Sequence, residues 1–112
     1  MIRVAARVRM RQNRAMARPP LLADEDVKAR LNAHPAWTFE GGKLHREFRF
    51  AGFSEAFGFM ARVALFAEKL DHHPDWSNVW NRVSVGLQTH DAGGVTDLDF
   101  RLAAEMDRIA GG

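Results

Sequence analysis

A pair of glycines, Gly41–Gly42, separates two short segments in which apolar and polar side chains alternate. Alternation with a period of two is typical of strands that bury one face. A two-residue turn can join such strands only as antiparallel neighbours. The apolar positions on the two sides are Trp37, Phe39, Leu44, Phe48 and Phe50, and Arg46 interrupts the second run. The chain is therefore predicted to contain an antiparallel β-hairpin between about residues 37 and 50.

Two further segments have the spacing of amphipathic helices. Residues 22–33 place three acidic side chains near the end at which a helix is electropositive, followed by apolar residues four positions apart. A longer helix is expected from an N-cap at Ser54 to about Leu70. Its apolar residues form two stripes, with Phe53, Phe57, Met60, Ala61 and Ala64 in one and Phe59, Val63, Phe66 and Leu70 in the other. So wide an apolar surface predicts burial on more than one side.

The last third of the chain is predicted to hold one strand and one helix. Alternating apolar residues from Val79 to Thr89 predict a long half-buried strand. Thr96 and Asp99 have the spacing of a capping box that opens a helix, with Asp99 in place of the usual Glu. The element order is then α-β-β-α-β-α. We therefore expect an α+β fold, a two-layer sandwich of an antiparallel sheet with helices packed on one face.

The charge is distributed unevenly along the chain. The formal net charge is +2, but residues 1–20 contain six arginines and no acid, which leaves ten basic and fourteen acidic residues in 21–112. We predict an Arg-rich N-terminal extension at 1–20 and a single domain at 21–112. The extension has three interpretations: a disordered segment or upstream translation start, an organellar transit peptide, or a nucleic-acid arm. Direct nucleic-acid binding by the acidic domain is not expected.

Two further properties of the composition limit the function. The chain has no cysteine, which excludes disulfides, thiolate metal sites and cysteine nucleophiles. No uncharged apolar run approaches the roughly 18 residues needed to span a bilayer, so no membrane association is expected. Arginines interrupt the N-terminus every few residues, unlike a secretory signal. The expected location is cytoplasmic, or organellar through residues 1–20 if the source is eukaryotic.

Three of the five histidines are placed where they could act together. His72 and His73 follow the long helix and precede Pro74, whereas His90 ends the predicted long strand. Proline restricts the residue before it to extended conformations, which would help to hold two adjacent imidazoles. Because histidine titrates near neutrality, such a cluster favours general acid and base catalysis on a planar heterocycle. Two alternatives remain open here: a zinc site, although the usual spaced motifs are missing, and loop positions without a catalytic role.

A longer motif surrounds these histidines. It reads Glu68-Lys69-x-x-His72-His73-Pro74-x-Trp76, and it is followed by Asn78-Val79, by Thr89-His90 at the end of the strand and by Asp99 in the closing helix. Over about residues 21–110 this pattern resembles the pterin-4a-carbinolamine dehydratase family, whose members are also described as dimerisation cofactors of a homeodomain transcription factor.

The resemblance implies an activity and a set of site residues. The activity is loss of water from a 4a-hydroxytetrahydropterin to give the quinonoid dihydropterin, in the recycling of the tetrahydropterin used by aromatic amino acid hydroxylases. No metal or organic cofactor is implied. The implied catalytic residues are His72, His73 and His90, the substrate-binding residues are Glu68, Trp76 and Thr89, and Asp99 is implied to support the histidine of the strand.

The resemblance also bears on partners. It implies a homodimer or homotetramer, in agreement with the wide apolar helix surface. The alternative function is an interaction module that dimerises or assists a partner protein, as the family's second description suggests. A related role in assembly or in pterin or molybdopterin metabolism is a third interpretation.

Overall fold

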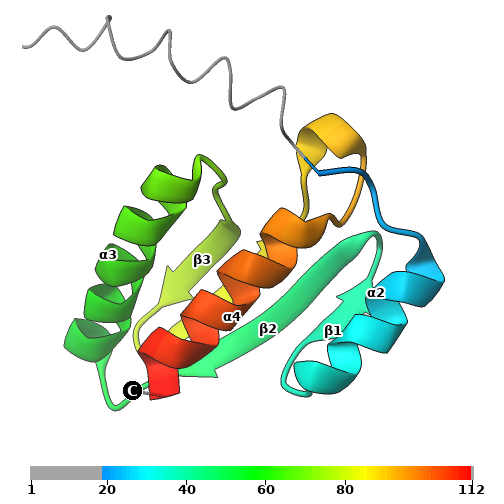
Figure 1. Ribbon diagram of the computed structural model, residues 1–112. Coiled ribbons are helices and arrows are strands. Elements are labelled where there is room, and N and C mark those ends of the chain that lie inside the picture. Colours follow the sequence, from blue (N-terminus) through cyan, green and yellow to red (C-terminus); the bar gives the residue numbers. More distant parts are fainter. Residues whose placement is uncertain (1–18, 112) are drawn as a thin grey trace, which may run out of the picture.

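The computed structural model describes residues 19–111, so the predicted extension at 1–20 lies outside the described residues except for Pro19 and Pro20. The three α-helices are α2 (Asp24–Arg30), α3 (Phe53–Leu70) and α4 (Asp97–Gly111) (Figure 1). The strands are β1 (Thr38–Glu40), β2 (Lys43–Arg49), β3 (Asp75–Val79) and β4 (Arg82–Leu87), and single 3-10 turns are formed by η1 (Leu31–Ala33) and η2 (His90–Ala92). Within this range no helix is both long and apolar enough to cross a membrane.

The strands form one antiparallel sheet with the spatial order β1-β2-β4-β3. The hairpin predicted around Gly41–Gly42 is confirmed, since Glu40 of β1 lies opposite Lys43 of β2. Both glycines have positive φ angles, 61° and 79°, which side chains other than glycine adopt at a cost. The turn therefore needs its two glycines, and the register of the first strand pair follows from it.

The segment predicted as one long strand from Val79 to Thr89 is instead part of a second hairpin. β3 and β4 pair antiparallel and are separated by Trp80 and Asn81, with Trp80 at φ 51°. The side-chain amide of Asn78 donates hydrogen bonds to the carbonyl oxygens of Trp80 and Arg82, at 3.0 and 2.9 Å. This turn contains neither glycine nor proline, and the apolar alternation continues across it. The single-strand prediction was therefore wrong for this segment, while the α+β class is confirmed.

All three helices lie on one face of the sheet, which confirms the two-layer sandwich (Figure 1). The core between the layers is built from alternate positions of the central strands and from one face of each long helix. Its members include Leu44, Phe48, Val83, Val85, Leu87, Phe59, Val63, Leu102 and Met106. The Phe48 and Phe59 ring centroids are 4.7 Å apart across the layers. This core fixes the ends of α3, β4 and α4 relative to one another.

Only one of the two apolar stripes of α3 is buried in the single chain. Phe59 and Val63 are in the core, whereas Phe53 and Phe57 are 52% and 57% exposed. The prediction that α3 is buried on more than one side is therefore wrong for the single chain. The N-cap prediction was also wrong: α3 begins one residue before Ser54, with Gly52 as its N-cap and no side-chain cap.

Candidate functional site

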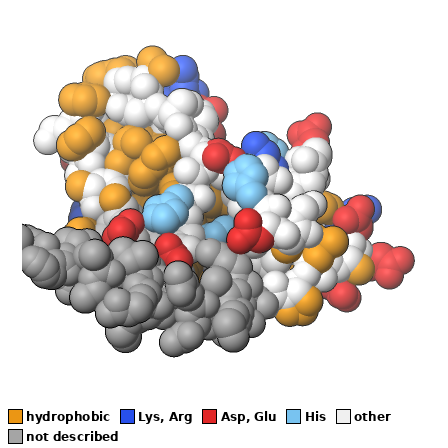
Figure 2. All heavy atoms as spheres, turned by 90° about the horizontal axis from the view of Figure 1, so that it is seen from above, with side chains coloured by type: hydrophobic (Ala, Val, Ile, Leu, Met, Phe, Trp, Pro, Cys, Tyr) orange, Lys and Arg blue, Asp and Glu red, His pale blue; other side chains and the backbone are white. Residues whose placement is uncertain are grey.

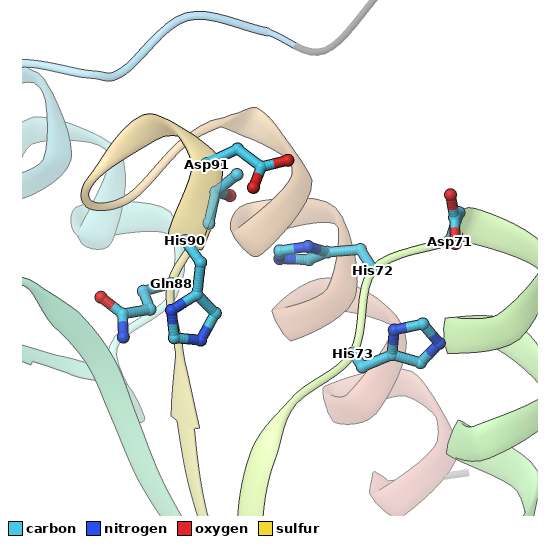
Figure 3. Close-up of a pocket in the computed structure, with 7 residues that line it drawn as sticks. Asp71, His72, His73, Gln88, His90 and Asp91 are labelled. Carbon is cyan, nitrogen blue, oxygen red and sulfur yellow. The ribbon is translucent and has the colours of Figure 1, made fainter. Parts of the chain in front are cut away.

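The histidines predicted to act together meet at one end of the sandwich, where α3 ends and where β4 leads into η2. A pocket of about 180 Å³ lies there and is lined by Asp71, His72, His73, Gln88, Thr89, His90 and Asp91. Figure 2 views the molecule from above and shows histidine and acidic side chains grouped together on this surface. Figure 3 shows His72 pointing into the pocket from the segment after α3 and His90 reaching it from the other side, whereas the ring of His73, on the same segment as His72, turns toward α3.

The C-terminal end of α3 positions the first two histidines. Asp71 caps the helix in the left-handed region, at φ 57° and ψ 43°. The backbone N–H of Asp71 donates to the carbonyl of Glu68, and that of His72 donates to the carbonyl of Ala67 at 3.1 Å. These bonds satisfy carbonyl groups that a helix end leaves unpaired. Pro74 then leads the chain into β3, so His72 and His73 lie in a connection with little freedom.

A closed loop after β4 positions the third histidine. Thr89 and Gly94 form an isolated antiparallel bridge, in which the Thr89 N–H donates to the Gly94 carbonyl at 2.7 Å. The Thr89 carbonyl accepts hydrogen bonds from the N–H groups of Ala92 and Gly93. η2 lies within this loop and begins with His90, which faces the pocket (Figure 3).

His72 is the buried member of the cluster and has a charged partner. Its Nε2 lies 2.6 Å from Oδ1 of Asp99, and the side chains are 7% and 0% exposed. Asp99 was expected to support the histidine of the strand, His90. That expectation was wrong, because α4 crosses the sheet so that its first turn faces the loop after α3. Asp99 therefore orients His72.

The other oxygen of Asp99 is also fully engaged. Oδ2 accepts hydrogen bonds from the Thr89 hydroxyl and from the backbone N–H of Thr96, each at 2.9 Å. The predicted capping box is confirmed by this second bond, and the Thr96 hydroxyl accepts from the N–H of Leu98 at 3.2 Å. Asp99 thus serves the helix start and the site together.

His73 and His90 are exposed and have looser partners. His73 Nε2 lies 3.1 Å from Oε1 of Glu68, and its ring turns toward α3, away from His90 (Figure 3). His90 is 73% exposed in its side chain, and its Nε2 lies 4.0 Å from Oδ2 of Asp75. Asp75 is also 3.4 Å from the Lys43 ammonium group. Each of the three imidazoles therefore has a carboxylate nearby.

The structure brings together six of the seven predicted site residues. Four of them, His72, His73, Thr89 and His90, line the pocket, Asp99 lies beneath His72, and Glu68 bonds His73. Trp76 is the exception: it is half-buried against the core and is not among the residues that line this pocket. Because β3 begins at Asp75, strand alternation sends Trp76 to the helix-covered face. That Trp76 borders the ligand stays a prediction.

Five residues of the site were missed by sequence reasoning: Asp71, Asp75, Gln88, Asp91 and Thr96. Asp71 and Asp91 could have been suspected, since each adjoins a predicted histidine in the sequence. Asp75 has the same signal within two residues of His73. Gln88 adjoins the predicted Thr89, and Thr96 was predicted only as the capping partner of Asp99; the place of both at the site depends on how the loop after β4 folds back.

The arrangement is suited to proton transfer. A neutral imidazole offers one donor and one acceptor, and an imidazolium offers two donors, so three rings around one pocket can both deliver and accept protons. Within residues 19–111, no group of three or more His, Cys, Asp or Glu side chains is arranged to hold a metal ion. The fold and the site thus define a class, a small α+β domain with a histidine cluster for acid and base chemistry.

Comparison with known proteins gives the family. Residues 20–109 match the family model described as pterin 4 alpha carbinolamine dehydratase. A protein of Solibacter usitatus that carries this dehydratase name is 52% identical over 91 residues, covering 81% of this chain and 96% of the relative. A Bordetella avium protein with the same name is 56% identical over 87 residues, covering 76% and 81%. The chain belongs to the pterin 4 alpha carbinolamine dehydratase family, and its members are hydro-lyases.

Two solved structures share the fold. The crystal structure of a transcriptional coactivator/pterin dehydratase from Brucella melitensis is 48% identical, with a TM-score of 0.78, and covers 80% of this chain and 98% of its own. A pterin dehydratase-like protein identified as a RuBisCO assembly factor in the alpha-carboxysome is 22% identical, with a TM-score of 0.59 over 69% of this chain and 92% of its own. At that identity the second likeness concerns the fold alone.

Proposed function

We propose that this protein removes water from a 4a-hydroxytetrahydropterin to give the quinonoid dihydropterin, with its histidines as the acid and base. The observation that carries the proposal is that His72, His73 and His90 all line one pocket, each beside a carboxylate. Family membership supports the dehydration itself. The pocket, at about 180 Å³, is smaller than the roughly 300–1,000 Å³ of most small-molecule sites. It therefore suits the reacting edge of a bicyclic ring rather than the whole substrate.

The reaction needs two proton transfers. The C4a–O bond breaks and the hydroxyl leaves with the bonding electrons, so a proton must reach that oxygen to release water. The N5–H proton must be removed, so that the N5 electrons can form the new double bond to C4a. The protons balance if one imidazole donates a proton to the leaving oxygen and another accepts the N5 proton. One water molecule is then the only product besides the quinonoid dihydropterin.

The two roles suit different histidines. When neutral His72 donates a hydrogen bond from Nε2 to Asp99, its Nδ1 remains an acceptor. This suits His72 to act as the base that takes the N5 proton. His90 is open to solvent, where it can take up a proton from water, and it lies 4.0 Å from Asp75, so we assign it the acid role. His73, bonded to Glu68, is positioned to orient the ring or share the acid role.

The test is stopped-flow dehydration of chemically generated 4a-hydroxytetrahydropterin. His73→Ala and His90→Ala should each slow the reaction, by about 10²- to 10⁴-fold for a group that acts as general acid or base. His45→Ala is the matched control, because His45 lies on β2 outside the pocket and its Nε2 bonds the Glu40 carbonyl. Near wild-type rates in both site variants would contradict the proposal.

The cellular role proposed is recycling of the tetrahydropterin of an aromatic amino acid hydroxylase, by a homodimer or homotetramer. The exposed aromatic pair on α3 supports self-association, since the Phe53 and Phe57 ring centroids lie 5.8 Å apart at the surface. Light scattering should report a mass of at least two chains, and Phe57→Glu should lower it.

A second candidate function is that of a protein-interaction module. The observation that favours it is the description of the Brucella melitensis relative as a transcriptional coactivator as well as a pterin dehydratase. A stable complex with a regulatory protein, unchanged when all three site histidines are replaced by alanine, would support this role. Loss of the complex in that variant would argue against it.

A further inference from the structure

The hydroxyl groups of Thr89 and Thr96 form a buried hydrogen-bonded chain that ends on Asp99. Their oxygens are 2.8 Å apart, and Oγ1 of Thr89 is 2.9 Å from Oδ2 of Asp99. Both threonines and Asp99 are at most 2% exposed. At such sites an unpaired polar group is costly, so the proton positions must satisfy every member of the chain.

The direction of this chain can be assigned from its two ends. At one end the Leu98 N–H donates to the Thr96 hydroxyl oxygen, at 3.2 Å. At the other end the Thr89 hydroxyl donates to Asp99. Each hydroxyl has a single proton, so the Thr96 proton must go to the Thr89 oxygen. Every hydrogen bond in the chain therefore points toward Oδ2 of Asp99.

This direction determines what Asp99 can offer to His72. Oδ2 already accepts two hydrogen bonds, from the Thr89 hydroxyl and the Thr96 N–H. A carboxylate is an acceptor at both of its oxygens and has no donor. Oδ1 is then an acceptor as well, and at 2.6 Å it requires a donor on Nε2 of His72.

We propose that Thr96, acting through Thr89 and Asp99, is a positioning residue that holds His72 as the Nε2–H tautomer. The base assigned to His72 rests on the proposed function, but the tautomer itself does not. The opposite tautomer would place two acceptors, Nε2 and Oδ1, against each other. The buried hydroxyls of Thr89 and Thr96 thus fix which nitrogen of His72 carries the proton, and leave Nδ1 free to act as the base.

The first test is nuclear magnetic resonance of the full chain labelled with ¹⁵N-histidine, at a pH above the ordinary histidine pKa of about 6.5. The wild-type His72 ring should have a protonated Nε2 and an unprotonated Nδ1. Thr89→Val should lower the ratio of Nε2–H to Nδ1–H forms by about fivefold, the equivalent of one net hydrogen bond. Thr96→Val should lower it less, because Thr89 can still donate to Asp99.

Serine variants and a distant threonine serve as controls. Thr89→Ser and Thr96→Ser retain the hydroxyl and should keep the wild-type ¹⁵N shifts, whereas Thr38→Val removes an exposed hydroxyl on β1 and should change nothing at His72. If Thr96→Val loses its helix cap and fails to fold, Thr89→Val still decides, since its hydroxyl is not part of the cap. Wild-type His72 shifts in folded Thr89→Val would overturn the proposal.

The second test uses the reaction. Thr89→Val should lower kcat by about tenfold with little change in KM, similar to the effect of removing the hydrogen-bond partner of a metal-binding histidine, and Thr89→Ser should restore it. If the tautomer changes in Thr89→Val but the wild-type protein has no dehydratase activity, the proposed function is rejected and the positioning role stands. Normal dehydratase activity with an unchanged tautomer in Thr89→Val would reject the positioning role alone.

Discussion

His73 and Glu68 are joined by a hydrogen bond of 3.1 Å between Nε2 and Oε1, five residues apart at the end of α3. Their side chains are 58% and 82% exposed. Exposed ion pairs contribute little to stability, because water screens them and long side chains lose freedom in forming them. The contact therefore orients the His73 ring rather than holding the fold together.

Glu68→Gln should accordingly have a mild effect. Glutamine retains an oxygen that can accept from the His73 ring, so we expect the dehydration rate to fall by less than about tenfold, below the effect of removing a general acid or base. Stopped-flow rates of Glu68→Gln and His73→Ala, measured side by side, check this. An equal loss in both variants would mean that the carboxylate itself takes part in the reaction.

Asp75 should matter for His90 more than for the fold. Asp75→Asn removes the charge that lies 4.0 Å from His90 while keeping the side chain's size. We expect kcat to fall by several-fold, less than the roughly 10²-fold of a lost general acid. Lys43→Met is the control, since it removes the other partner of Asp75 and leaves the carboxylate in place. If the two variants lose activity equally, the Asp75–His90 contact is not the cause.

Stability should depend on Asp107, which ties the first hairpin to α4. Its carboxylate accepts a hydrogen bond at 2.8 Å from Nε1 of Trp37, a residue only 3% exposed, and it also pairs with Arg46. Asp107→Ala leaves a buried indole donor unpaired and should lower the free energy of unfolding by about 1–3 kcal/mol. Urea unfolding monitored by tryptophan fluorescence measures this.

Asp97→Ala is the matched control for that experiment. Asp97 also sits on α4 and pairs with Arg30 at 2.7 Å, but both side chains are well exposed, at 49% and 39%. The loss should be at most about 1 kcal/mol, as for other surface pairs. A larger loss for Asp97→Ala than for Asp107→Ala would contradict the assignment of the buried contact.

Glu105 offers a prediction about pH. Hydrogen bonds from Arg108 lower the pKa of the Glu105 carboxyl below its ordinary value, with a smaller opposing effect of burial. A depressed pKa stabilises the fold above the unfolded-state pKa, and this contribution is lost as the pH falls through the folded-state pKa. In Arg108→Gln the pKa of Glu105 should rise, which a carboxyl NMR titration measures. An unchanged titration would show that the pair does not form in solution.

The two hairpins show what local sequence can predict. The Gly41–Gly42 turn could be predicted, because its positive φ angles favour glycine and two glycines stand in the sequence at the turn. The Trp80–Asn81 turn is not, because it is held by the Asn78 side chain bonding across to Arg82. Because this contact forms only once the chain has turned, the alternation of apolar residues does not predict it.

Part of the site could likewise be predicted from local sequence, and part could not. The motif around His72 and His73 pointed to the correct end of α3, and a strand ending in His90 was expected to face it. The pairing of Asp99 with His72 was not predictable, because the two residues are 27 positions apart and their contact depends on how α4 crosses the sheet. The face of the sheet that Trp76 takes was not predictable either, because it depends on β3 beginning at Asp75.

The double use of Asp99 limits how this domain can be engineered. A capping box usually carries Glu at this position, but Asp99 is fully buried, so Asp99→Glu would not improve the cap without displacing its neighbours. The added methylene would push the carboxylate out of line with His72, which now lies 2.6 Å away. Stability and turnover therefore share one side chain, and a substitution made for either purpose alone would disturb both.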